Sequence, residues 1–185
     1  MDKIIIVDIE KCLACKSCEI ACALAHSRSK ILSEAAQESP KPQRMMAVEA
    51  AGEYGVPIQC RHCESAPCIE ICPTGAIHRE DEQSPVVVEA DLCIGCKLCM
   101  LVCPFGVLKI GKEGRAIIKC DMCYERLKEG MVPECVEACP TGAIKLVSLE
   151  EVTKSRRKEA SEQIVRESGS GKGRQGKAKR VKGGK

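Results

Sequence analysis

Sixteen cysteines in four groups of four constrain this chain of 185 residues more than any other feature. The chain has one Phe, two Tyr and no Trp, so large side chains for an ordinary apolar core are scarce. Bound metal or disulfide bonds are therefore expected to replace part of that core. The four groups are Cys12, Cys15, Cys18 and Cys22; Cys60, Cys63, Cys68 and Cys72; Cys93, Cys96, Cys99 and Cys103; and Cys120, Cys123, Cys135 and Cys139.

The N-terminal segment bears on the redox compartment, and so on the choice between metal and disulfides. Ile4–Val7 is only a short apolar run followed by acidic residues, unlike the apolar region of a signal peptide. No segment approaches the roughly 18–20 apolar residues that span a bilayer. We therefore expect a cytoplasmic protein without a membrane span, where dense cysteines usually hold metal.

The spacing of the cysteines indicates which metal they hold. The third group reads C-x2-C-x2-C-x3-C-P, the run in which three cysteines wrap one [4Fe–4S] cluster and the fourth binds a second cluster. Zinc is the rival, although its C-x2-C pairs are usually separated by a longer loop. The spacing predicts four [4Fe–4S] clusters, with zinc and disulfide bonds as the alternatives.

The other three groups vary the same pattern. Ala23 replaces the proline after group one, and the middle gap widens to residues 64–67 in group two and 124–134 in group four. Cys72 and Cys139 begin C-P-T-G-A-I, while Cys103 begins C-P-F-G-V-L. The glycine of these runs can take the positive φ of a turn. Turn chemistry alone would explain one such run, but three predict a duplicated ferredoxin unit.

The runs between the cysteines predict short strands and helices. Good helix formers from Glu19 to His26 predict a helix across Cys22, and equivalent short helices are expected after Cys68, Cys99 and Cys135. The fold class is therefore α+β, with two ferredoxin-like (βαβ-type) dicluster modules, short strands and helices, and much loop. Short β-branched runs predict strands at Ile4–Val7, Pro85–Glu89, Arg115–Lys119 and Ala143–Val147.

The four-cluster body is expected to cover residues 1–147. One module takes residues 1–35 and 112–147, the second takes residues 58–111, and a loop is inserted at residues 36–57. Prolines and glycines mark this insertion as loop, which is either inert or faces a partner.

Beyond the body, the sequence predicts a C-terminal helix at residues 148–167. Ser148 and Glu151 form a capping-box pattern at its start. Residues 168–185 contain seven Lys or Arg and no acid, and they predict a disordered basic tail. Such a tail serves solubility or docking, or it binds nucleic acid or acidic lipid. No aromatic residue interleaves the charges, so no nucleic-acid partner is expected.

The order of the four groups, with widened second and fourth gaps, resembles the four-cluster iron–sulfur subunits associated with molybdenum reductases, formate dehydrogenases and hydrogenases. The resemblance covers about residues 1–150. Within that family, the runs Ala21–Ser27, Pro40–Pro42 and Gln59–Cys63 are most similar to the ferredoxin-like protein that accepts electrons from carbon monoxide dehydrogenase.

This resemblance implies which cysteines share a cluster. Groups one and four would exchange their last cysteines, and so would groups two and three. The implied ligand sets are Cys12, Cys15, Cys18 and Cys139; Cys120, Cys123, Cys135 and Cys22; Cys60, Cys63, Cys68 and Cys103; and Cys93, Cys96, Cys99 and Cys72.

Other polar residues near the cysteines have two interpretations each. His26, His62 and His78 could act as ligands or proton relays, but sixteen cysteines already supply four clusters, so hydrogen-bonding or surface roles are expected. Lysine or arginine residues next to ligands either raise a cluster's reduction potential or are solvated loop charges. These are Arg61, Lys97 and Lys119.

The expected function is electron transfer, with no catalytic residue in this chain. Four thiolates would fill every cluster, and no flavin or dinucleotide fingerprint is present. The resemblance implies a hetero-oligomeric relay from carbon monoxide dehydrogenase to a hydrogenase or a flavin-dependent NAD(P) reductase. A subunit of a formate dehydrogenase–hydrogenase complex is the alternative. An iron–sulfur sensor would need a folded reading module that the sequence does not show, and a free-standing enzyme fits least.

Overall fold

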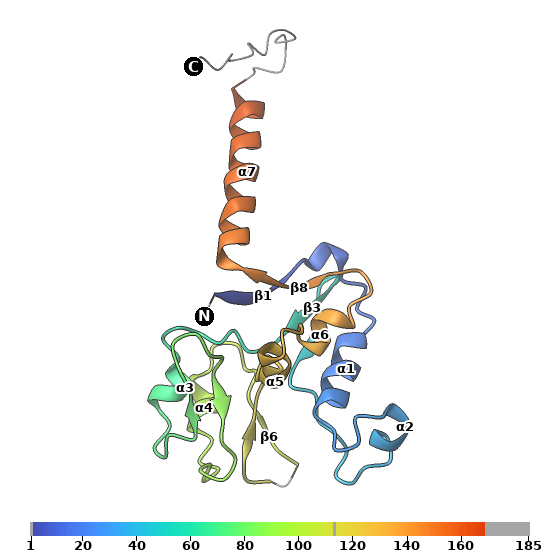
Figure 1. Cartoon of the computed structure of the whole chain (residues 1–185), viewed down its shortest axis with the longest axis vertical. Coiled ribbons are helices and arrows are strands. Elements are labelled where there is room, and N and C mark those ends of the chain that lie inside the picture. Colours follow the sequence, from blue (N-terminus) through green and yellow to red (C-terminus); the bar gives the residue numbers. More distant parts are fainter. Residues whose placement is uncertain (1, 113, 169–185) are drawn as a thin grey trace, which may run out of the picture. The chain divides into compact units, whose positions relative to one another are not determined.

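The computed structural model describes residues 2–112 and 114–168 (Figure 1). The chain divides into two compact units, with the boundary between Val147 and Ser148. All sixteen cysteines lie in the first unit. The predicted basic tail lies outside the described residues, apart from Ser168. No helix in the described part of the chain is long and apolar enough to cross a membrane.

The strands form small two-stranded sheets, as short β-branched runs between loops would suggest. The first sheet joins the two ends of the body, because β1 pairs with β8. The other three are antiparallel pairs of β2 with β3, β4 with β5, and β6 with β7. Their bounds are β1 Lys3–Val7, β2 Ala47–Ala51, β3 Tyr54–Ile58, β4 Ile77–His78, β5 Val87–Val88, β6 Lys109–Ile110, β7 Ile117–Ile118 and β8 Ile144–Ser148.

The helices of the first unit are short, and several carry cysteines. Helix α1 ends at Ala25, so His26 caps it rather than extending it as expected. Helices α1 and α6 pack against each other, and so do α3 and α4 (Figure 1). The bounds are η1 Ile9–Lys11, α1 Ser17–Ala25, α2 Leu32–Ala35, α3 Pro67–Glu70, α4 Leu98–Val102, α5 Tyr124–Lys128 and α6 Glu134–Glu137.

Two separate core clusters lie in the first unit, and cysteines belong to both. One cluster packs Ile5, Met46 and Ile144 with cysteines of groups one and four. The other packs aliphatic residues around Cys99, and most of them come from the chain segments that carry groups two and three. Ile117 belongs to this second core cluster, although the predicted boundary at residue 112 places it in the other module, with residues 1–35. The β6–β7 pair explains the difference. Strand β7 follows residue 112 in the sequence but pairs with β6 at residues 109–110, before the predicted boundary.

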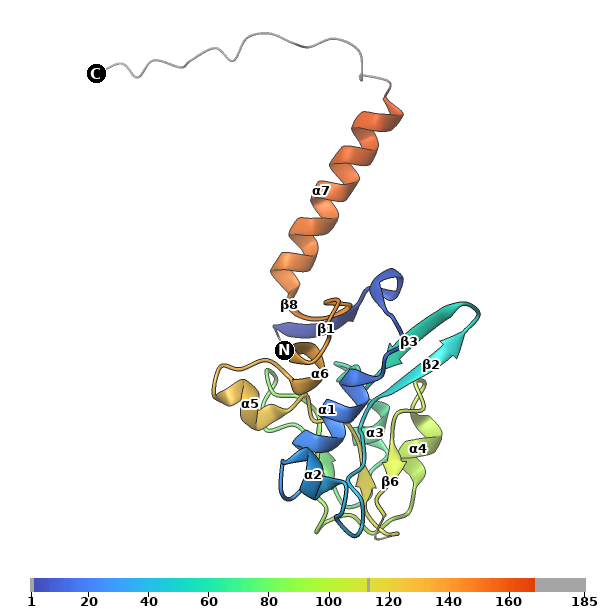
Figure 2. The same cartoon turned by 90° about the vertical axis from the view of Figure 1, so that its right-hand side faces the viewer.

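The insertion at residues 36–57 is not simply loop, which corrects the expectation from its prolines and glycines. Strands β2 and β3 form a hairpin there, with Gly52 in the turn at a φ of +60° (Figure 2). The alanine-rich β2 carries little β propensity, so its pattern did not indicate a strand. Glu19 fastens the hairpin to α1, since its Oε1 accepts the Val48 N–H at 2.6 Å and its Oε2 lies 3.1 Å from Arg44 Nε.

The second unit begins with helix α7, Leu149–Glu167. Its predicted capping box is confirmed. The Ser148 hydroxyl accepts the Glu151 N–H at 3.1 Å, and the Glu151 carboxylate accepts the Ser148 N–H at 2.8 Å. Two of the N–H groups that the start of a helix leaves unpaired are thereby satisfied.

Candidate metal centres

The four C-x2-C loops share one backbone feature. In each, the residue two positions after the first cysteine has a positive φ, namely Ala14, His62, Gly95 and Met122. Three of these are not glycine, and such residues rarely adopt this conformation without a compensating constraint. All four loops therefore share one local backbone conformation, as repeated copies of the same cysteine-loop motif would.

The turns after the last cysteines are also alike. Gly75, Gly106 and Gly142 all have positive φ, which confirms the expectation for the C-P-x-G runs. Each glycine donates its N–H to the carbonyl of the preceding cysteine, at 3.2–3.3 Å. The turn directs the chain away from the cysteine and into a following apolar pair, and Ile77 and Ile144 are buried there.

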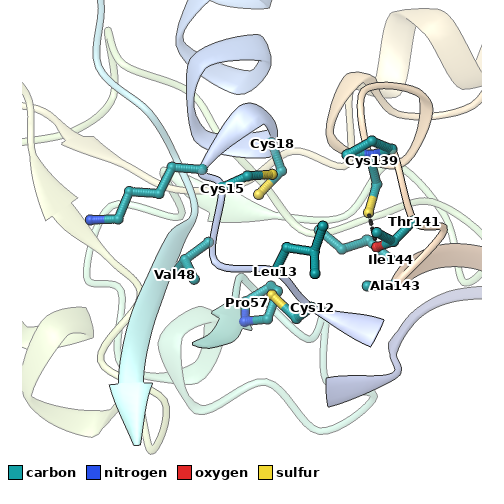
Figure 3. A pocket seen from close by; sticks show the side chains of 12 residues that line it. Cys12, Leu13, Cys15, Cys18, Val48, Pro57, Cys139, Thr141, Ala143 and Ile144 are labelled. Carbon is teal, nitrogen blue, oxygen red and sulfur yellow. Dashed lines mark hydrogen bonds between the residues drawn. The ribbon is translucent and has the colours of Figure 1, made fainter. Parts of the chain in front are cut away.

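One cavity in the body is lined by Cys12, Cys15, Cys18 and Cys139, which we name the first site (Figure 3). Three of these cysteines come from the loop before α1 and its first turn, and Cys139 follows α6. Figure 3 shows their side chains around the same space, beside Leu13. The last cysteine of group four thus lies with group one.

Two further cavities repeat this three-plus-one arrangement. The second site is lined by three cysteines of group two and one of group three: Cys60, Cys63, Cys68 and Cys103. The third site reverses these contributions and is lined by Cys72, Cys93, Cys96 and Cys99.

We name the remaining cysteines, Cys22, Cys120, Cys123 and Cys135, the fourth site. Burial raises the pKa of Cys120 well above its usual value, and Cys135 and Cys22 add to the effect. Burial likewise raises the pKa of Cys135 to about 12, with contributions from Cys22 and Cys123. Charge interactions therefore link these thiols, and Cys22, Cys120 and Cys135 are buried. A buried thiolate is stable only beside a compensating positive charge.

A compact zinc site would place its ligand atoms close together. A zinc–sulfur bond of about 2.3 Å brings the four sulfurs of a tetrahedral site within about 4 Å of one another. Among the described residues, the metal-ligating atoms that gather within 4.8 Å in a group of three or more are those of His26, Asp121 and Cys123. In the described part of the chain, no three sulfurs of one cysteine set gather this closely. All sixteen thiols are free of disulfide bonds.

Two threonines that the sequence did not single out support the crossing cysteines. Thr141 Oγ1 lies 3.8 Å from Cys139 Sγ, and Thr74 Oγ1 lies 3.8 Å from Cys72 Sγ. Burial raises the pKa of both thiols, but backbone N–H groups and the threonine hydroxyl outweigh it and lower the pKa below its usual value. Threonine at the same position of both C-P-T-G-A-I runs was the available signal. These donors favour the thiolate, which is the form that binds iron.

Backbone N–H groups reach other cysteines. The His62 N–H lies 3.4 Å from Cys60 Sγ, and the Met122 N–H lies at the same distance from Cys120 Sγ. The Met45 N–H, from the insertion, lies 3.2 Å from Cys22 Sγ. The insertion therefore contributes to the fourth site, which its composition did not reveal.

Two histidines lie close to cysteine sites. His26 Nδ1 lies 2.7 Å from the Cys22 carbonyl oxygen, and its Nε2 lies 3.1 Å from Asp121 Oδ1. Burial lowers the pKa of His26, but the hydrogen bonds to Asp121 and Cys22 outweigh it and raise the pKa to about 11. The opposite holds at His62, where burial, Lys119 and Arg79 lower the pKa to about 3. The hydrogen-bonding role expected for these residues fits both positions.

The three charged residues next to cysteines differ in exposure. Arg61 and Lys97 are exposed, so water screens their charges. Lys119 is buried. The sequence could not separate these cases, because a lysine beside a ligand gives the same pattern whichever way its side chain points.

The fold and the cysteine sites define an iron–sulfur protein of the electron-transfer class. A 4Fe-4S dicluster domain matches residues 52–149, which hold groups two to four, and a 4Fe-4S binding domain matches residues 9–25, which hold group one. The chain belongs to the 4Fe-4S dicluster domain family.

Several curated relatives match most of the chain. An iron–sulfur protein of Rhodospirillum rubrum is 44% identical over 80% of this chain and 83% of its own length. The putative electron transport protein YsaA of Escherichia coli is 40% identical, over 84% of this chain and 96% of its own. The thiosulfate reductase electron transfer subunit PhsB of Salmonella typhi is 35% identical, over 78% of this chain and 74% of its own.

Proposed function

We propose that this chain relays single electrons between partner oxidoreductases through four [4Fe–4S] clusters, one at each cysteine site. Each cluster would supply a reversible one-electron couple. The support is that cysteines of different groups line the same cavities, three from one group and the last from another. The ligand sets are those named for the four sites: Cys12, Cys15, Cys18 and Cys139; Cys60, Cys63, Cys68 and Cys103; Cys72, Cys93, Cys96 and Cys99; and Cys22, Cys120, Cys123 and Cys135.

The cysteines also suggest where partners bind. Cys15 in the first site and Cys96 in the third are exposed, whereas no cysteine of the second or fourth site is. Next to them, Leu13 is 70% exposed and Ile94 is 61% exposed, at the same position of the two loops. An exposed thiol beside an exposed aliphatic residue suits a partner that must approach closely and exclude water. The first and third sites are therefore the two ends of the relay.

Placing a charge at either end tests this arrangement. Leu13→Asp and Ile94→Asp should each slow electron exchange with one partner about tenfold, because a buried carboxylate at a docking surface costs at least that much affinity. Stopped-flow reduction and reoxidation would measure the two rates separately. Leu32→Asp is the matched control, since Leu32 is 61% exposed and lines none of the cysteine cavities. Unchanged rates in both variants would place the docking surfaces elsewhere.

The donor we propose is carbon monoxide dehydrogenase, and the acceptor a hydrogenase or a flavin-dependent NAD(P) reductase in a cytoplasmic complex. This choice of donor is supported by a resemblance in sequence. The ferredoxin-like protein that accepts electrons from carbon monoxide dehydrogenase is similar to this chain at Ala21–Ser27, Pro40–Pro42 and Gln59–Cys63. Two of these runs touch the cysteine sites directly: one contains Cys22, and the other contains Cys60 and Cys63.

Rapid mixing tests the donor. With CO and a catalytic amount of carbon monoxide dehydrogenase, the broad visible absorbance of the clusters should bleach, because oxidation of CO and water to CO2 releases two electrons and two protons. The same protein with formate dehydrogenase and formate should be reduced at least about tenfold more slowly. Fast reduction by formate alone would make a formate dehydrogenase the donor. Absence of iron from the purified protein would reject the relay itself.

A further inference from the structure

Lys119 is a buried lysine beside two of the cysteine sites. Only 3% of the residue is exposed. Its ammonium group donates to the Cys120 carbonyl oxygen at 2.6 Å and to the Val86 carbonyl oxygen. Within residues 2–112 and 114–168, no ion pair joins it to a carboxylate. Such a charge is costly to bury unless negative charge lies near.

The position of Lys119 is between the second and fourth sites. Cys120, whose carbonyl it binds, belongs to the fourth site. Val86 connects it to the second site, because its N–H donates to Nδ1 of His62 at 3.0 Å, and His62 lies between Cys60 and Cys63. Val86 therefore binds Lys119 through its carbonyl oxygen and His62 through its N–H.

Lys119 is in contact with residues of both sites. Val86, whose carbonyl oxygen accepts one of its hydrogen bonds, lines the cavity of the second site. Cys120, whose carbonyl oxygen accepts the other, is a buried cysteine of the fourth site. A single ammonium group thus favours negative charge in two places, and the negative charge missing from its own surroundings would be supplied by cysteine thiolates with bound iron.

We propose that Lys119 raises the reduction potentials of the second and fourth sites together, so that electrons are held at these two sites relative to the first and third. Each reduction adds one electron and no proton or bond, so a fixed positive charge between the sites stabilises the reduced form of both. When an electron passes between the second and fourth sites, the donating site is reoxidised and the accepting site is reduced. The total interaction of the electron with Lys119 stays nearly constant. The inference rests on the clusters of the proposed function, whose failure would appear separately as absent iron.

The test compares three substitutions in full-length, iron-loaded protein. Lys119→Met removes the charge, Lys119→Gln removes it but keeps a hydrogen-bond donor, and Lys119→Arg keeps the charge. Potentials are measured by EPR-monitored redox titration. Both neutral variants should lower two of the four potentials, so that the reduced-to-oxidised ratio at fixed potential falls about tenfold, a shift of about 59 mV for a one-electron couple. The other two potentials should stay, and Lys119→Arg should resemble the wild type.

Lys97→Met is the matched control, since Lys97 also directly adjoins a cysteine but is exposed to solvent. It should shift the potentials far less than Lys119→Met. Four unchanged potentials in the neutral variants, with iron content intact, would overturn the proposal. So would an equal shift of all four, because that would reflect a general loosening of the fold. Loss of iron from both neutral variants but not from Lys119→Arg would show that the charge holds the clusters rather than tuning them, and would also overturn it.

Discussion

Iron-free protein is expected to show no cooperative thermal unfolding transition. The described sheets have two strands each, which is marginal for independent stability. Cys18, Cys22 and Cys135 belong to the first core cluster and Cys99 to the second. Without iron, these groups of core residues lose the bound metal that would join their chain segments. The free energy of metal binding is therefore part of the free energy of folding. Calorimetry and near-UV circular dichroism of protein freed of iron under anaerobic, reducing conditions would measure this.

The loaded protein provides the control for that experiment. It should unfold in a sharp transition, and anaerobic reconstitution of the iron-free chain with iron and sulfide should restore that transition. Helix α7 is expected to persist in part without iron, because its capping box and i,i+4 pairs are local. Residual far-UV signal would therefore not count against the prediction. A sharp transition in iron-free protein would contradict it and show that the aliphatic residues suffice.

Replacing Cys12 and replacing Cys139 are expected to remove the same cluster. Both residues line the first site, although they belong to different groups. Cys12→Ala and Cys139→Ala should each lose about four of about sixteen iron atoms, and the double variant should lose no more than either single one. Cys139→Ala combined with Cys120→Ala should instead lose about eight, because independent sites add. Iron analysis with EPR measures both outcomes.

The opposite pattern would reject the exchange of last cysteines. If Cys139 served the fourth site, its loss would be additive with that of Cys12 and not with that of Cys120. Leu13→Ala provides a control for general damage, because Leu13 lines the first cavity without offering a ligand atom. It should keep the full iron content.

Much of the local structure near the cysteines could be predicted from sequence, since it depends on short-range chemistry. The positive φ of Gly75, Gly106 and Gly142 follows from the C-P-x-G turn, and the capping box at Ser148 follows from residues three apart. Strand β1 and most of helix α1 were also expected. The ligand sets themselves stay a prediction.

Features that depend on long-range contacts could not be predicted in the same way. The β2–β3 hairpin forms from an alanine-rich strand because Glu19 and the body hold it, not because its own residues favour it. The Met45 N–H reaches Cys22 across the insertion. The burial of Lys119 depends on Val86, far along the chain, whose carbonyl accepts its hydrogen bond.

The exposure of Cys15 and Cys96 also determines how the molecule is damaged. An oxidant approaches through the same openings as a partner, and accessible thiolates are oxidised to sulfenic acid and beyond before shielded ones. Attack should therefore begin at the first and third sites, while Cys120 and Cys135 remain protected by burial. A molecule injured in this way would keep intact clusters inside yet exchange no electrons with either partner. Its remaining colour and iron would then overstate the fraction that still works.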